Sequence, residues 1–211
     1  MRSLLRTVLV AAFLMAPPAV LAGQSSLGFR GGLSLASLGG DDAGDIDTKK
    51  GFSFGGFLNV PVSSVLAVQV GAGFTQKGAT ETEYGVGVDY AVSYIETPLL
   101  LTLSPSTSGN VGFHFFIGPA LAFKASCAIG VSQAGVTVES TCSMPGAGLK
   151  SIDLGAMVGA GLEIGLTESV FLVLDGLYNL GLTKMGDGGL DDDVKNRAFS
   201  FLAGLSFPLG G

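Results

Sequence analysis

Hydrophobic and polar residues alternate along the segment SIDLGAMVGAGLEIG, residues 151–165. One set of alternate positions, from Ile152 to Ile164, is entirely apolar, whereas the other carries Asp153, Glu163 and the glycines. Successive side chains of a β-strand point to opposite faces, so this pattern predicts a strand with one apolar face. That face would point inward in a soluble sandwich or barrel, and outward to lipid in a membrane barrel.

The same alternation recurs along most of the chain. Seven further segments show it, at residues 27–35, 52–60, 66–77, 90–103, 112–124, 172–182 and 199–207. Segment 90–103 is the least regular, and there we assign Tyr90, Tyr94 and Glu96 to the inner face. Short links (61–64, 104–110, 167–169) alternate with long polar links at residues 39–50, 78–88, 126–150 and 185–196. This rhythm is typical of outer-membrane barrels. It predicts an all-β, eight-stranded, antiparallel up-and-down transmembrane barrel, with the four long links as external loops.

The first 22 residues predict a cleaved export signal. Arg2 and Arg6 precede an apolar run of about ten residues, and Pro17 and small residues up to Ala22 follow. The alternative is a retained anchor, but the run is shorter than the ~20 residues a membrane helix needs. We therefore expect one mature barrel domain over residues 23–211, of a size that suits a single domain.

Composition and charge narrow the class of protein. The mean hydropathy is +0.55 and only 13% of residues are charged, yet no long apolar run follows the signal. Without Arg2 and Arg6 the chain has 9 basic and 17 acidic residues, a net charge of −8. This charge argues against nucleic acid as a partner. The high hydropathy without a spanning helix favours strands that lie in the lipid of the outer membrane.

The positions opposite the apolar face are dominated by small residues and carry charges of both signs. Small residues suit the narrow interior of an eight-stranded barrel, so we expect the apolar face to meet lipid. A secreted, lipocalin-like barrel is the alternative. Buried ions are costly alone, so we expect Lys77 to pair with Glu96, and Arg30 with Asp175 or Glu163. These charges either fill and rigidify the interior of the barrel or line a path for protons or ions. The predicted lumen charges are Arg30, Lys77, Glu96, Lys124, Asp153, Glu163 and Asp175.

Two cysteines, Cys127 and Cys142, fall in the longest link. An even pair in an exported chain predicts one disulfide, with two free thiols as the alternative.

Catalytic motifs are absent from the sequence. The single histidine, His114, occupies an inward position, and no nucleophile-and-base motif accompanies it. We expect neither an enzyme nor a cofactor. Two acidic links could take Ca²⁺ or bridge to lipopolysaccharide phosphates, although solvated loops are the simpler interpretation. Their carboxylates, the candidate metal ligands, are Asp41, Asp42, Asp45, Asp47, Asp187, Asp191, Asp192 and Asp193.

Five short motifs in order resemble the outer-membrane β-barrel family typified by PorT and, more loosely, small barrels such as OmpA and OmpX. They are QKG, Y-x-E-x-P-L-L, GP, D-x-G-x-x-x-G-x-G and Y-x-x-G-L, and they span the mature chain. The family's positions map onto Tyr94, Glu96, Pro98, Asp153, Gly159 and Gly161. The resemblance implies a bacterial outer-membrane location and no enzymatic activity. The chain lacks the terminal phenylalanine that barrel-assembly machinery often reads, and Phe207 is the candidate replacement.

Three functions follow as hypotheses. The first is a structural or surface-interaction role, with an unknown loop partner. The second is a narrow pore for small solutes or ions, and the third, suggested by the resemblance alone, is an accessory part of a secretion system. For the face assignment, we expect Leu162→Arg, placed near mid-strand, to cost roughly 2–4 kcal/mol, and Gly161→Ser to be milder.

Overall fold

The structure is a computed structural model that describes residues 24–39, 47–83, 86–105, 109–133, 136–141, 150–184 and 194–210. The predicted signal segment, residues 1–22, lies outside the described residues. Every regular element in the described part is a β-strand. The strands are β1 (Ser26–Gly39), β2 (Asp47–Pro61), β3 (Leu66–Glu83), β4 (Val86–Leu103), β5 (Val111–Gln133), β6 (Val136–Thr141), β7 (Ile152–Gly165), β8 (Phe171–Gly181) and β9 (Lys195–Pro208).

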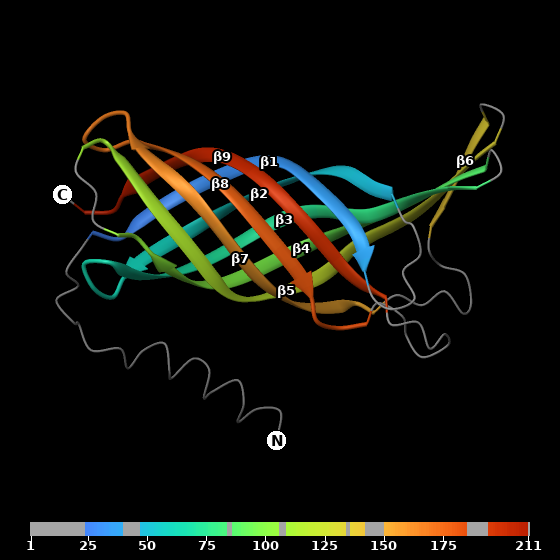
Figure 1. Cartoon of the computed structure of the whole chain (residues 1–211), viewed down its shortest axis with the longest axis horizontal. Coiled ribbons are helices and arrows are strands. Elements are labelled where there is room, and N and C mark those ends of the chain that lie inside the picture. Colours follow the sequence, from blue (N-terminus) through green and yellow to red (C-terminus); the bar gives the residue numbers. More distant parts are fainter. Residues whose placement is uncertain are drawn as a thin grey trace, which may run out of the picture.

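Eight of the described strands close into a ring, as Figure 1 shows. Each strand pairs antiparallel with its neighbours in the order β1-β2-β3-β4-β5-β7-β8-β9, and β9 pairs again with β1. The ninth strand, β6, pairs only with the far part of β5. The predicted eight-stranded antiparallel barrel is therefore confirmed, and β6 is an addition to it.

Both ends of the described barrel lie at one rim. Ser26 at the start of β1 pairs with Pro208 at the end of β9 and with Asn59 of β2. The tight link after β2 lies at the same rim, where the Val62 and Ser63 N–H groups donate to the Leu66 carbonyl. We call this rim the short-turn end.

The apolar face points outward along the whole ring. Leu33 is 63% exposed, Ile117 62% and Phe29 57%, whereas the inward Lys77 is only 2% exposed. In the segment 151–165 the same rule holds, because Val158 is 49% exposed. An exposed apolar surface that surrounds the whole barrel is far larger than the apolar patches of water-soluble proteins. The face assignment made from the sequence is therefore confirmed. No helix of the described residues is long and apolar enough to cross a membrane.

Two of the four predicted loops are largely strands, which corrects the sequence analysis. Link 78–88 is a hairpin, because β3 runs to Glu83 and β4 begins at Val86. Link 126–150 contains the last third of β5 and all of β6. The other two links are shorter than expected at their edges: β1 ends at residue 39, β2 begins at residue 47 and β9 at residue 195. The missed strands extend past the apolar belt, the band of outward apolar side chains around the barrel, so their outward positions are not restricted to apolar residues.

Tyr90 also departs from its assignment. It has the inner parity of β4 but is 39% exposed. The reason is its height: β7 begins at Ile152, whose partner Phe123 pairs with Ile95 of β4. Tyr90 lies beyond that level, where β7 no longer continues the barrel wall beside β5.

Candidate functional site

The lumen near the short-turn end holds a buried charged cluster. Arg30 of β1 forms an ion pair with Asp175 of β8 and donates to Gln69 Oε1 of β3 at 3.1 Å. His114 Nε2 of β5 lies 2.7 Å from the other Asp175 oxygen, Oδ1. The Asp175 side chain is 0% exposed, so its charge is met entirely by these partners. Of the two partners expected for Arg30, the structure shows Asp175, and the Arg30 guanidinium also lies 4.9 Å from the Phe57 ring.

An apolar layer follows this cluster along the barrel axis. On two strands it begins at the next inward position, from His114 to Phe116 on β5 and from Asp175 to Leu177 on β8. The layer packs across the lumen, and its members are Leu100, Phe116, Ala120, Met157, Leu177 and Leu202. These side chains are all buried, and they fill the part of the lumen beside β4, β5, β7, β8 and β9. A cavity of about 50 Å³ next to the layer is lined by Arg30 of the charged cluster and by Glu96 from further along the lumen.

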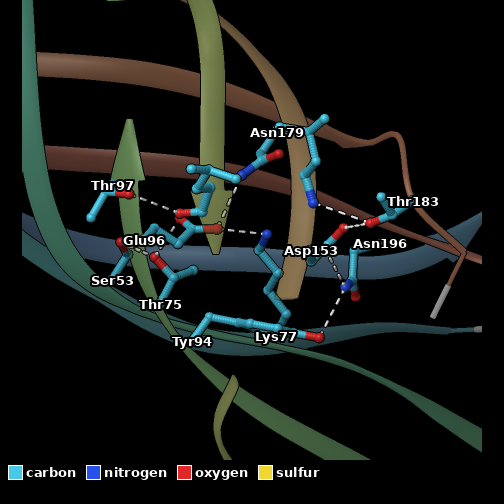
Figure 2. Close-up of polar contacts among 12 residues, drawn as sticks. Ser53, Thr75, Lys77, Tyr94, Glu96, Thr97, Asp153, Asn179, Thr183 and Asn196 are labelled. Carbon is cyan, nitrogen blue, oxygen red and sulfur yellow. Dashed lines mark hydrogen bonds and ion pairs between the residues drawn. The ribbon is translucent and has the colours of Figure 1, made fainter. Parts of the chain in front are cut away.

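A second polar layer lies beyond the apolar one and is centred on Glu96 (Figure 2). Lys77 Nζ is 2.6 Å from Glu96 Oε1, so the expected pair is present. Asn179 Nδ2 donates to the same oxygen at 3.1 Å, and Thr75 Oγ1 donates to Glu96 Oε2 at 3.0 Å. Both carboxylate oxygens of Glu96 thus have a donor, as a buried charge requires.

Asp153 anchors a third polar group nearer the far rim (Figure 2). It accepts from Thr183 Oγ1 at 2.5 Å and from Asn196 Nδ2 at 2.8 Å. Asn196 Nδ2 also donates to the Tyr94 hydroxyl at 3.1 Å. The sequence analysis identified the charges but missed neutral partners such as Asn179, although their inward parity was a usable signal.

The two remaining predicted lumen charges are placed differently. Glu163 accepts from Ser206 Oγ at 3.2 Å and forms no ion pair with any residue that the structure describes. It is half-buried near the short-turn end, on β7. Lys124 is half-buried on β5, in register with Tyr94 of β4.

Inward glycines make room for the large inward side chains. A Cβ at Gly28 would overlap the Phe57 ring, and one at Gly159 would overlap Phe116. At Gly161 it would overlap Asp175 Oδ1 and His114 Nε2. Gly161→Ser is therefore not the mild change expected from the sequence, because it displaces a buried, paired carboxylate.

The predicted disulfide and metal sites lie mostly outside the described residues. Cys127 is disulfide-bonded, whereas Cys142 is not among the described residues. Asp47 begins β2, and its side chain is not described. Within the described ranges, no group of three or more His, Cys, Asp or Glu side chains could hold a metal ion. The other seven candidate ligands, outside the described residues, are Asp41, Asp42, Asp45, Asp187, Asp191, Asp192 and Asp193.

At the rim opposite the short-turn end, four strands continue past the barrel as a projecting sheet. It comprises residues 79–83 of β3, 86–92 of β4, 126–133 of β5 and all of β6, and it extends away from the ring at the right of Figure 1. The register gathers most of its apolar side chains on one face: Val88, Val131 and Val138 form one cross-strand row, and Tyr90 is in line with Ile129. Gln133, opposite Val136, and Ser140, opposite Ile129, share this face. We call it the apolar face. The neighbouring rows, which point to the other face, include Asp89 with Glu139 and Ser132 with Thr137.

The apolar face of the projecting sheet is open. Val136 and Val138 are each 66% exposed and Val131 is 41% exposed. On β4, the side chains of the apolar face have the same parity as those that point into the barrel lumen. The side chains of the polar face have the parity of those that point to lipid. The order of polarity is therefore reversed between the barrel wall and the projecting sheet, which indicates that the sheet has left the apolar belt.

A closed antiparallel ring with an apolar exterior and a polar interior defines a transmembrane β-barrel. The chain belongs to the family described as outer membrane protein beta-barrel domain, whose model matches residues 18–187. The family places the protein in the bacterial outer membrane. This match is to the broad family and does not reach PorT, so the PorT resemblance stays a prediction.

Several solved outer-membrane proteins share the fold. A major outer membrane protein from Thermus thermophilus is 14% identical, with 89% of this chain and 100% of that chain covered, at a TM-score of 0.53. Neisserial surface protein A is 16% identical, with 89% and 100% covered, at a TM-score of 0.49. Ail, the attachment invasion locus protein of Yersinia pestis, is 15% identical, with 88% and 100% covered, at a TM-score of 0.45. No curated protein matches the chain. At these identities the likeness shows the fold alone.

Proposed function

We propose that this protein is a surface-interaction protein of the bacterial outer membrane. The barrel serves as a membrane anchor, and the projecting sheet carries the contact with a partner outside the cell. The observation that carries the proposal is the open apolar face of that sheet, with Val136 and Val138 each 66% exposed. Contiguous exposed apolar surface outside lipid is typical of an interaction site.

The orientation follows from the two rims. Small outer-membrane barrels have short periplasmic turns and longer external excursions. The short-turn end, with Ser26 and Pro208, therefore faces the periplasm, and the projecting sheet faces outward. An ion pair links the sheet to β2, where Lys49 Nζ lies 2.5 Å from Asp89 of β4. The disulfide at Cys127 lies at the base of the sheet, in register with the buried Val92. A braced sheet presents its apolar face with little entropy left to lose on binding.

The apolar face can be tested against its own reverse side. We expect the double change Val131→Asp and Val138→Asp to reduce attachment about tenfold or more, because two charges would have to be desolvated in the contact. The control is Ser132→Asp with Thr137→Asp, the adjacent cross-strand pair on the other face. The measurement is the number of bacteria displaying each variant that attach to two surfaces. One surface is coated with extracellular-matrix proteins, and the other is covered with a layer of the same bacteria. Equal losses in the two variants, or no attachment above cells without the protein, would reject the proposal.

The narrow-pore alternative is disfavoured by the buried apolar side chains that occupy much of the lumen. The side chains of Phe116 and Leu177 offer no polar group to replace the water of a passing ion. We therefore expect no stepwise conductance from the protein in a planar bilayer, with a general porin in the same bilayer as the positive control. Conductance steps that change when Lys77 is replaced by methionine would instead support the pore.

A further inference from the structure

A cavity of about 410 Å³ occupies the lumen at the short-turn end, and we call it the vestibule. Its lining runs from the exposed turn residues Ser104 and Glu168 to the buried His114 and Asp175. At its inner end, beyond His114 and Asp175, the next inward side chains are Phe116 and Leu177 of the apolar layer. A volume of this size is typical of small-molecule sites.

The vestibule has an excess of negative charge. Asp175 is neutralised by Arg30, but Glu163 and Glu168 also line the cavity, and the described lining contains no lysine or arginine. The contact seen for Glu163 is with a neutral hydroxyl, that of Ser206. A half-buried carboxylate of this kind favours a cationic ligand over an anion or a neutral sugar.

Two buried oxygens in the lining have no hydrogen-bond partner among the described residues. One is Thr102 Oγ1, on a residue that is only 3% exposed, and the other is Asn59 Oδ1. An amide oxygen can only accept, so it calls for a donor. Buried polar groups of folded proteins are normally satisfied, by protein, water or ligand. Asn59 of β2 and Thr102 of β4 thus add polar groups without a protein partner to the lining that they share with Glu163 of β7.

Apolar walls complete the site. Phe57, Phe171 and Val173 line the same cavity. An alkyl chain can pack on such walls, and an ammonium group is attracted to an aromatic face. Two separate carboxylates, two unpaired acceptors and an apolar wall match a linear cation with a donor group at each end.

We propose that the vestibule binds an aliphatic di- or polyamine. One ammonium group donates to Glu163, and a second pairs with Glu168 at the mouth. The methylene chain lies against Phe171 and Val173. The site is at the opposite end from the projecting sheet, so it goes beyond the surface role and does not depend on it.

The first test is calorimetric titration of the full folded protein, in zwitterionic detergent micelles, with putrescine and with spermidine. We expect one saturable site whose affinity falls as salt is raised. Glu163→Gln should weaken binding about tenfold or more, since a charge-assisted hydrogen bond is lost. The matched control is Glu139→Gln, which removes the same charge from the exposed strand β6 and should leave binding unchanged.

Two further measurements keep the proposal falsifiable. Folding of each variant is checked by heat-modifiable gel migration, and if Glu163→Gln does not fold, Glu168→Gln in the exposed turn takes its place. The neutral probe 1,4-butanediol should not bind. Absence of saturable amine binding, equal weakening by Glu139→Gln, or butanediol binding as strong as that of putrescine would each overturn the proposal.

Discussion

Arg30→Met is expected to destabilise the folded barrel by about 3–5 kcal/mol, the usual cost of removing one partner from a buried ion pair. The change leaves Asp175 with His114 as its remaining lumen partner, while its side chain stays 0% exposed. It also removes the guanidinium that lies over the Phe57 ring. The measurement is urea unfolding in detergent micelles. Because the chain has no tryptophan, unfolding is followed by circular dichroism and by gel mobility.

The matched control for Arg30→Met also removes the charge of Asp175, which the single change leaves without its cation. Adding Asp175→Asn keeps the side-chain shape and a hydrogen bond to His114, but no ion remains unpaired. We expect the double variant to recover a large part of the lost free energy of unfolding. If the single and double variants are equally unstable, the cost comes from lost packing around Arg30 and the ion pair is not its cause.

Val158→Arg is expected to cost about 2–4 kcal/mol, because it places a cation at mid-membrane on the lipid face. Val158 lies at the centre of β7, is 49% exposed and pairs with Ile117, which is 62% exposed. The sequence analysis chose Leu162 for this test, but Leu162 lies three residues from the end of β7. That choice was wrong about depth, although it was right about the face.

Two controls separate depth from face. Leu162→Arg, near the short-turn end, is expected to cost only about 0–1 kcal/mol, as found close to the membrane interface. Val138→Arg on β6 is expected to leave stability nearly unchanged, although Val138 is 66% exposed, because β6 lies beyond the apolar belt. The measurement is again the free energy of unfolding in micelles or vesicles. A cost at Val138 equal to that at Val158 would place β6 in lipid and contradict the proposed orientation.

Much of the barrel could be predicted because its environment imposes a period of two on every spanning strand. Lipid outside and a narrow lumen inside select apolar and small or polar residues at alternate positions, so strands and faces could be read locally. The pair of Lys77 and Glu96 was also predictable, since the two residues lie on adjacent strands joined by one hairpin. Where strands leave the membrane, this selection ends, and the hairpin at 78–88 and the strand β6 were missed for that reason.

The sequence by itself determined the fold class, the face that meets lipid and the set of residues that point inward. Only the tertiary structure decided which of them meet. Arg30 and Asp175 are 145 residues apart and come together because β9 closes the ring between β1 and β8. Contacts across a lumen depend on closure, strand stagger and side-chain length, and none of these is written in the alternation of any single strand. The same holds for the vestibule, because every strand of the ring contributes to its lining and these strands meet only in the closed barrel.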